Sequence, residues 1–275
     1  MLNINENDVV NYQKNGFVVT NSYLSDSLQA SISKAYNEFI NNNQNLTLEE
    51  MASPHLVEGA GLKHNKSNEL CMEFLNIGKN NEIVSQVKKI LGDDVILWGM
   101  HCMHKEAKTG KKIPWHQDGT YWPIEPKATC SVWIAITDVD ENNGCMQFIP
   151  GSHKLGVLPH LQEDKVTKEG DLKGSLDLKI DTNSFDVNQS VYCKIKKGQA
   201  SFHDTYLLHS SDANFSDKPR KAIVIRYMPS SSLFDRSKPD RTSANGFKYD
   251  FSERPIFLVS GSAKNNDLRN SNYNS

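Results

Sequence analysis

No stretch of the sequence is apolar for long enough to cross a bilayer, and no internal repeat is visible. The first residues lack both the cationic start and the apolar core of a signal peptide. Lys and Arg number 31 against 33 Asp and Glu, so the net charge of -2 provides no general basic field for nucleic acid or an anionic membrane. We therefore expect a cytoplasmic protein whose partner is a small molecule, not nucleic acid or a membrane.

The five cysteines indicate neither a metal site nor a disulfide framework, because their number is odd, they are widely scattered and none forms a CxxC pair. This pattern predicts buried free thiols. Hydrophobic residues make up 37% and charged residues 23% of the chain, which excludes a largely disordered protein. A length of 275 residues suits one well-packed domain.

The first third of the chain has the residue spacing of helices. Helices are expected over residues 8–15, 25–40 and 83–91. A glycine follows the first and the third of these segments, and a serine that can cap the helix opens the second. Residues 44–70 show weak periodicity, which predicts a long loop or lid.

Beyond residue 94 short β-branched and aromatic runs replace the helical spacing. With one early apolar run, the expected strands are 17–19, 95–104, 128–137, 145–150, 190–195, 200–203, 206–209 and 222–228. Helices followed by strands, without βαβ alternation, predict a mainly β fold: a double-stranded β-helix (jelly roll, cupin-like) with N-terminal helices on its outside. We expect a single domain over residues 1–262, with a helical flank to about 94 and a core over about 95–230, and a disordered tail over 263–275.

The chemistry is concentrated around His116 and Asp118. A single His-x-Asp is a weak signal, because it arises readily by chance. In an extended segment, however, residues i and i+2 project to the same side, so both side chains can bind one ion. A second histidine from a distant strand would complete a 2-His-1-carboxylate site with open positions for a chelating cosubstrate and O₂.

Two histidines, His203 and His209, could supply that ligand. Arg220 follows His209 by eleven residues and opens the expected strand 222–228, which can run antiparallel to the strand carrying His209. A guanidinium brought over the metal in this way can bind the far carboxylate of a dicarboxylate through two parallel bonds. The spacing favours His209 as the ligand and His203 as a neighbouring core residue, with Arg226 as the competitor of Arg220.

The chain resembles the phytanoyl-CoA dioxygenase-like family of Fe(II)/2-oxoglutarate oxygenases, closely over residues 95–230. The motifs that carry the resemblance are His116-Gln117-Asp118, Trp122-Pro123, Trp133-Ile134-Ala135, Asn142-Asn143-Gly144-Cys145, Ile149-Pro150-Gly151-Ser152-His153, His209-x-Ser211, Asn214, Ser216, Arg220 and Arg226-Tyr227. Together they are far more specific than any single motif.

The resemblance implies that His116, Asp118 and His209 hold iron. It implies that Arg220 binds the 5-carboxylate of 2-oxoglutarate. Ser211, Trp133 and Gln117 are further candidates for the cosubstrate pocket; Trp133 could equally be a core residue, and Gln117 points away from its neighbours in an extended segment. Related halogenases replace the carboxylate ligand by Ala or Gly, so Asp118 favours hydroxylation, with O₂ consumed, succinate and CO₂ released, and ascorbate as reductant.

Several alternatives remain open at this point. The same iron centre could catalyse desaturation, cyclisation or epoxidation, and a third hypothesis is a jelly-roll binding protein without turnover. Tyr121 and Trp122 could line the substrate pocket or pack in the core. The lysine-rich loop 105–112 is expected near the site entrance, where it would suit an anionic substrate group, although charge runs are usually solvated loops.

Overall fold

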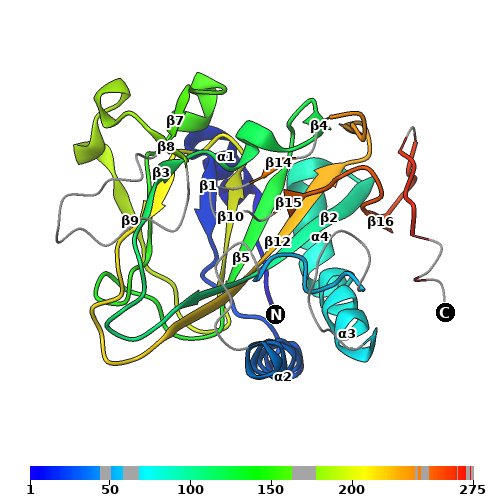
Figure 1. Cartoon of the computed structure of the whole chain (residues 1–275), viewed down its shortest axis with the longest axis horizontal. Helices are drawn as coiled ribbons and strands as arrows, with labels where there is room; N and C mark the ends of the chain where they lie inside the picture. Colours follow the sequence, from blue (N-terminus) through cyan, green and yellow to red (C-terminus); the bar gives the residue numbers. More distant parts are fainter. Residues whose placement is uncertain are drawn as a thin grey trace.

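Two antiparallel sheets face each other and carry the N-terminal helices on one outer side (Figure 1). This computed structural model describes residues 1–43, 51–57, 68–162, 178–238, 241–242, 248–264, 266–270 and 273. Within them, the helices are α1 (Glu6–Asn15), α2 (Asp26–Asn42), α3 (Asn68–Gly78) and α4 (Asn81–Leu91). The predicted class, a mainly β jelly roll with flanking N-terminal helices, is confirmed.

The larger sheet has six strands, in the order β1 (Phe17–Val19), β10 (Ala200–Asp204), β5 (Cys130–Ala135), β12 (Arg220–Pro229), β2 (Val95–Lys105) and β16 (Phe257–Ser260). The smaller sheet has the order β3 (Ile113–His116), β11 (His209–Ser211), β6 (Met146–Phe148) and β9 (Val191–Cys193). Three short pairs complete the described strands: β4 (Ile124–Glu125) with β13 (Leu233–Phe234), β7 (His160–Gln162) with β8 (Leu178–Ile180), and β14 (Arg241–Thr242) with β15 (Lys248–Tyr249).

Alternation along β12 shows how the sheets divide the core. Ala222 and Val224 point between the sheets, into a cluster that also contains Trp133 and Phe148. The intervening residues Ile223, Ile225 and Tyr227 join the larger cluster beneath the helices. Because successive side chains of a strand point to opposite faces, Arg220 and Arg226 share the inner face with Ala222 and Val224.

The first helices end where the sequence predicts. The side chain of Asn5 caps α1, and Gly16 ends it with a φ of 82°, a conformation that glycine adopts without strain. Ser25 caps α2, accepting a hydrogen bond from the backbone of Leu28. Gly92 ends α4. The helices predicted over residues 8–15, 25–40 and 83–91 thus agree with α1, α2 and α4 to within two residues at each end.

The expected loop over residues 44–70 is only partly described. Residues 44–50 and 58–67 lie outside the described residues, and the end of the range is wrong because α3 begins at Asn68. This helix was not predicted, although its buried residues recur with helical spacing: Leu70, Cys71, Phe74, Leu75 and Ile77. It packs against α2, where the ring of Phe74 meets that of Phe39 edge to face at 5.9 Å.

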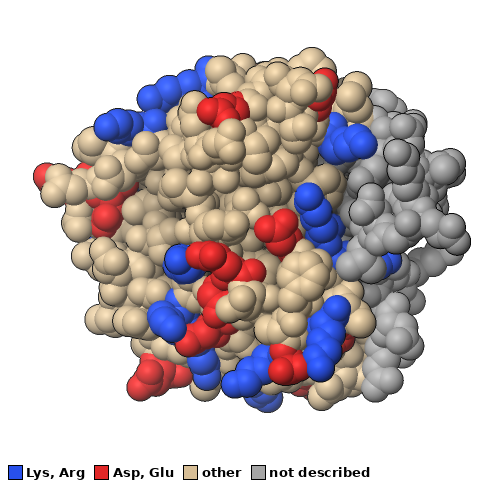
Figure 2. Space-filling view, turned by 90° about the vertical axis from the view of Figure 1, so that its left-hand side faces the viewer, with Lys and Arg blue, Asp and Glu red and all other residues tan. Residues whose placement is uncertain are grey.

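Strand β9 is the outer edge of the smaller sheet. It lies at the left of Figure 1, and Figure 2 shows this side of the molecule, where uncharged surface dominates the upper half and charged side chains gather below. Val191 and Tyr192 of β9 are both exposed.

All five cysteines are buried and free, as the sequence predicts. None of the helices described is long and apolar enough to cross a membrane.

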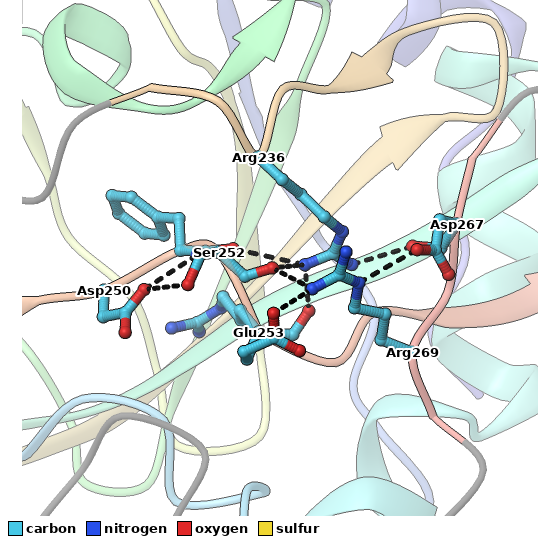
Figure 3. Close-up of polar contacts among 8 residues, drawn as sticks. Arg236, Asp250, Ser252, Glu253, Asp267 and Arg269 are labelled. Carbon is cyan, nitrogen blue, oxygen red and sulfur yellow. Dashed lines mark hydrogen bonds and ion pairs between the residues drawn. The ribbon is translucent and has the colours of Figure 1, made fainter.

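The C-terminal segment is held by two arginines (Figure 3). Arg236 donates hydrogen bonds to the carbonyl oxygens of Phe251, Ser252, Arg254 and Asp267. Arg269 forms ion pairs with Asp267 and Glu253. These bonds fix Phe251 and Ile256 in an apolar cluster that also contains Trp98 and Trp122. The predicted tail over 263–275 stays a prediction; within it, the ring of Tyr273 packs on Phe257 with 5.0 Å between ring centroids.

Truncating Phe74 tests the packing of the unpredicted helix α3. Phe74 is fully buried, so we expect Phe74→Ala to lower the free energy of unfolding by about 3–5 kcal/mol through lost burial and a cavity. The measurement is urea denaturation, with Phe215→Ala as control because Phe215 is 71% exposed. Equal stability losses in the two variants would show that α3 does not pack on α2 as described.

Candidate metal centre

Two histidines meet across neighbouring strands of the smaller sheet. Strands β3 and β11 are antiparallel, and their register places His209 directly opposite His116. The ring centroids are 4.1 Å apart. Residues directly opposite each other on adjacent strands are among the closest pairs that a sheet creates, so the pairing brings two imidazoles together from positions 93 residues apart in the sequence.

Both rings are oriented by the same local bond. Nδ1 of His116 lies 2.8 Å from the carbonyl oxygen of Pro114, and Nδ1 of His209 lies 2.9 Å from that of Leu207. A carbonyl oxygen only accepts, so each Nδ1 carries the proton and donates it. Each Nε2 is therefore a free lone pair, which is the form of histidine that binds a metal.

Asp118 completes the cluster from the end of β3. Gln117 has an extended backbone, with φ -119° and ψ 131°, and Asp118 opens a short 3₁₀ turn, Asp118–Tyr121. Oδ1 of Asp118 lies 3.7 Å from Nε2 of His116 and 4.0 Å from Nε2 of His209. One ligand atom from each of the three residues lies within 4.8 Å of the others. An ion of ordinary metal–ligand distance can reach all three.

The protonation states suit a divalent cation. Burial alone would raise the pKa of the Asp118 carboxyl, but the charge of the Arg226 guanidinium beside it outweighs burial and holds that pKa well below its usual range. Burial and the neighbouring His116 lower the pKa of His209 to about 3. An ionised carboxylate and a neutral imidazole are the forms that ligate metal without first losing a proton.

His203 lies beside this cluster and not within it. Its ring centroid is 5.5 Å from that of His209, and burial lowers the pKa of His203 to about 4, so it is neutral. Oγ of Ser201 lies 3.4 Å from its Nδ1. Of the two histidines left open by the sequence, the structure brings His209 to the other ligand candidates.

The side chain of Gln117 is bound by backbone groups of two loops, and its expected place in the cosubstrate pocket stays a prediction. Its side-chain amide donates to the carbonyl oxygens of Gly156 and Tyr206, both at 2.7 Å, and accepts from the backbone of Leu158 at 2.8 Å. Both of its donors are therefore used by backbone groups. Gln117 ties the segment between two ligand candidates to the loops before β7 and before β11.

His160 supports the segment that carries the cluster, and the sequence analysis did not single it out. Its Nε2 accepts a hydrogen bond from the backbone N–H of Gln117 at 3.1 Å, and its Nδ1 lies 2.9 Å from the carbonyl oxygen of Leu158. Gly119, next to Asp118, has no room for a side chain, because an added Cβ would collide with Oγ1 of Thr205. No sequence spacing signals these supports, since they come from separate loops.

Arg220 is buried at the other end of the inner face of β12. Its side chain is 1% exposed, and its guanidinium lies over the ring of Trp133 at 5.4 Å. Burial lowers the pKa of Arg220 to about 10, which still leaves it charged at neutral pH. Among the described residues no carboxylate forms an ion pair with it, and its Nε has no hydrogen bond. An unpaired buried charge is costly, so this position suits an anionic ligand.

Trp133 and Ser211 are the remaining candidates for the cosubstrate pocket. The indole Nε1 of Trp133 is buried and has no hydrogen-bond partner in the described structure. Ser211 is buried two residues beyond His209 on β11, and its carbonyl oxygen accepts from Lys105 at 3.2 Å. Strand β12 does not pair with β11; it faces it from the opposite sheet. Arg220 therefore approaches across the interior of the barrel.

A jelly roll with two histidines and one aspartate converging at one end is the arrangement of mononuclear non-haem metal oxygenases. The chain belongs to the phytanoyl-CoA dioxygenase family, whose family model matches residues 12–222. Phytanoyl-CoA dioxygenase, peroxisomal, of Bos taurus is 27% identical over 235 residues, covering 78% of this chain and 66% of the relative. The match thus spans slightly less than two thirds of that relative's length.

Solved structures share the fold. The non-heme monooxygenase ThoJ, in its apo form, is similar with a TM-score of 0.65 and 21% identity, covering 92% of this chain and 84% of the other. The epimerase SnoN, solved in complex with Fe3+, alpha ketoglutarate and nogalamycin RO, is similar with a TM-score of 0.62 and 20% identity, covering 82% and 84%. At these identities the likeness concerns the fold.

Removing the carboxylate tests whether the cluster binds metal. We expect Asp118→Ala to weaken Co(II) binding by at least about a hundredfold, because even residues that only orient metal ligands contribute about 10–100-fold. Isothermal titration with Co(II) measures this, and Asp217→Ala, which removes an 83% exposed carboxylate, is the control. Co(II) affinity that is the same in both variants would remove Asp118 from the site.

The support from Gln117 predicts a loss of stability. Gln117→Ala leaves the carbonyl oxygens of Gly156 and Tyr206 without this donor, so we expect the free energy of unfolding to fall by about 1–3 kcal/mol in the metal-free protein. Urea denaturation measures it, with the exposed Gln189→Ala as control. A variant as stable as the parent protein, but with weakened 2-oxoglutarate binding, would return Gln117 to the cosubstrate pocket.

Proposed function

We propose that this protein is an Fe(II)/2-oxoglutarate-dependent dioxygenase that hydroxylates a small organic substrate and releases succinate and CO₂. The observation that carries the proposal is the combination of a three-residue ligand cluster with a buried, unpaired guanidinium inside one barrel. The 2-His-1-carboxylate set is typical of non-haem Fe(II) oxygenases. Arg220 adds the feature that a dicarboxylate cosubstrate needs.

In this proposal His116, Asp118 and His209 hold iron, and the protein leaves the remaining coordination positions for cosubstrate and O₂. Bound iron would supply the activation of O₂ and the oxidative decarboxylation of 2-oxoglutarate. The carbonyl groups of Pro114 and Leu207 keep both imidazoles in the tautomer that binds through Nε2. Ascorbate is the proposed reductant that maintains Fe(II).

The cosubstrate would extend from the cluster toward Arg220. The guanidinium of Arg220 would bind the far carboxylate, which offsets the cost of its burial. Trp133 is proposed to donate its free Nε1–H to the same ligand, and Ser211 to line the pocket beside His209. The walls that exclude water around this path are apolar side chains of the cluster between the sheets, among them Val224 and Phe148.

The finer assignments concern the reaction outcome, the location and turnover. Hydroxylation is proposed as the reaction outcome, and desaturation, cyclisation and epoxidation are the alternatives. The mass of the product separates hydroxylation and alkene epoxidation, which add one oxygen, from desaturation and oxidative cyclisation, which remove two hydrogens. The NMR spectrum of the product then distinguishes the two members of each pair. A cytoplasmic location is proposed from the sequence, whereas curated relatives are named peroxisomal. A binding protein without turnover is disfavoured, because it would have no use for both a metal cluster and a buried free guanidinium.

Succinate formation tests the proposal directly. Purified protein supplied with Fe(II), ascorbate, O₂ and 2-oxoglutarate should form succinate even without its own substrate, and the Asp118→Ala variant should not. Mass spectrometry of the reaction measures succinate against time. If the parent protein binds Fe(II) yet forms no succinate above the variant, the proposed function is wrong.

Replacing Arg220 separates cosubstrate binding from metal binding. We expect Arg220→Ala to weaken 2-oxoglutarate binding at least about tenfold, the loss of a charge-assisted pair, while Co(II) affinity stays within about twofold. The control is Lys221→Ala, which removes the neighbouring cation on the outer face of β12, where it reaches Asn37. If 2-oxoglutarate binds Arg220→Ala as tightly as the control, Arg220 is not the clamp.

A further inference from the structure

A second guanidinium, that of Arg226, lies beside the ligand cluster. Its Nη2 is 3.6 Å from Oδ2 of Asp118, and its Cζ lies over the ring of Trp122 at 5.2 Å. The register places Arg226 opposite Ser131, which in turn lies opposite His203. Six residues of strand, about 20 Å, separate Arg226 from Arg220. The two arginines therefore serve opposite ends of the barrel interior.

Solvent exposure shows which end is open. The side chains of Arg226 and Asp118 are 15% and 13% exposed, whereas Arg220 is 1% exposed. An organic substrate that enters from solvent thus meets Arg226 before it reaches the interior. The cosubstrate carboxylate proposed for Arg220 lies at the closed end.

The guanidinium of Arg226 has N–H groups that lack a hydrogen-bond partner among the described residues. Arginine carries five N–H groups, yet none of the described residues accepts a hydrogen bond from Arg226, and its Nε is buried without a partner. Its contact with Asp118 is an ion pair longer than a hydrogen bond. Buried donors are normally satisfied, so the Nε–H group awaits a ligand or water.

Charge balance indicates what that ligand is. Iron(II) would be neutralised by Asp118 and the carboxylate of 2-oxoglutarate that binds it, and Arg220 by the far carboxylate. Within the described part of the site this leaves Arg226 as the one guanidinium without an anion of its own.

The lysine-rich loop 105–112, expected from the sequence to attract an anion at the entrance, is differently placed. Lys105 is 3% exposed, lies opposite Arg220 at the closed end, and donates to the carbonyl oxygens of Lys111, Ser211 and Asp212. Lys108 pairs with Asp217 at 2.7 Å. Both lysines therefore lie toward the end of β12 that carries Arg220, away from Arg226.

We propose that Arg226 binds an oxyanion of the organic substrate, a carboxylate or a phosphate-type group, and so positions the substrate over the metal. The planar fork of arginine suits two parallel bonds to such a group. Trp122 holds the guanidinium in place, and Trp122 itself packs on Trp98 at 4.5 Å in the cluster closed by the C-terminal segment. The inference rests on the proposed function for the metal ion and for the place of 2-oxoglutarate between that ion and Arg220.

The test uses matched probes, because the substrate is not identified. Protein loaded with Co(II) and 2-oxoglutarate is titrated with hexanoate, hexylphosphonate and the neutral hexanamide. Isothermal titration measures affinity, and the visible spectrum of Co(II) reports binding near the metal. Parent protein is compared with Arg226→Gln, with Arg226→Lys and with Lys221→Gln, a control that removes a cation from the opposite face of the same strand.

We expect the parent protein and Lys221→Gln to bind at least one anionic probe about tenfold more tightly than hexanamide, as charge-assisted bonds provide. Arg226→Gln should abolish this preference while Co(II) and 2-oxoglutarate affinities stay within about twofold. Arg226→Lys keeps the charge but not the fork, so it should retain part of the preference; it also decides the comparison if Arg226→Gln does not fold. Comparing the affinity for hexanoate with that for hexylphosphonate shows which of the two oxyanions the site prefers.

Two results would overturn the proposal. One is equal affinity of the parent protein for the anionic probes and hexanamide. The other is a loss of 2-oxoglutarate affinity, and not of probe preference, in Arg226→Gln, which would make Arg226 the cosubstrate clamp. Failure of the proposed function is seen separately, as a parent protein that binds Co(II) but not 2-oxoglutarate.

Discussion

The pairing of His209 with His116 across two antiparallel strands is the constraint on which the rest of the site depends. A slip of one residue in this register would turn one imidazole to the other face of the sheet. Each ring is also tied to the carbonyl oxygen two residues before it, so backbone geometry and tautomer are set together. Asp118 then needs only the extended backbone of Gln117 to reach the same side.

Electrostatics distinguish the two ends of the barrel. At the open end a carboxylate is kept ionised by the guanidinium of Arg226, and the imidazole of His209 is kept neutral by burial. At the closed end Arg220 and Lys105 lie opposite each other. Burial, and secondly the charge of Arg220, lower the pKa of Lys105 to about 6, and its Nζ donates hydrogen bonds to backbone carbonyl oxygens. Among the described residues no backbone carbonyl accepts a hydrogen bond from Arg220 in this way, which agrees with its proposed role as the group that binds the far carboxylate of the cosubstrate.

The sequence predicted the class of fold and the residues of the cluster because both depend on local patterns. Glycine and serine at helix ends, alternation in strands, and the spacing of His116 with Asp118 are visible without knowing the tertiary structure. The strand expected at 206–209 is displaced to His209–Ser211, because its first residues form the turn that carries the carbonyl bound by Gln117. Propensity alone cannot detect such a turn.

What the sequence could not predict depends on distant segments. Helix α3 was not predicted although its buried residues recur with helical spacing, because the loop expected over residues 44–70 was drawn past the start of the helix at Asn68. The supports of the cluster, Gln117 and His160, are 43 residues apart and meet only after β7 folds beside β3. In the sequence, Arg226 was only an alternative to Arg220 as the residue that binds the cosubstrate. Both arginines lie at even positions of β12 and so on the same face of the strand, but the sequence does not show which face is the inner one. The register of β12 with β2 and β5 was needed for that.

The central claim is that three side chains share one ferrous ion, and diffraction at the iron absorption edge from crystals of the Fe(II)-loaded protein, grown without oxygen, tests it most directly. The structure predicts a single strong anomalous peak within bonding distance of Nε2 of His116, Nε2 of His209 and one carboxylate oxygen of Asp118. A peak that lacks any one of these three contacts, or that lies elsewhere in the protein, would contradict it.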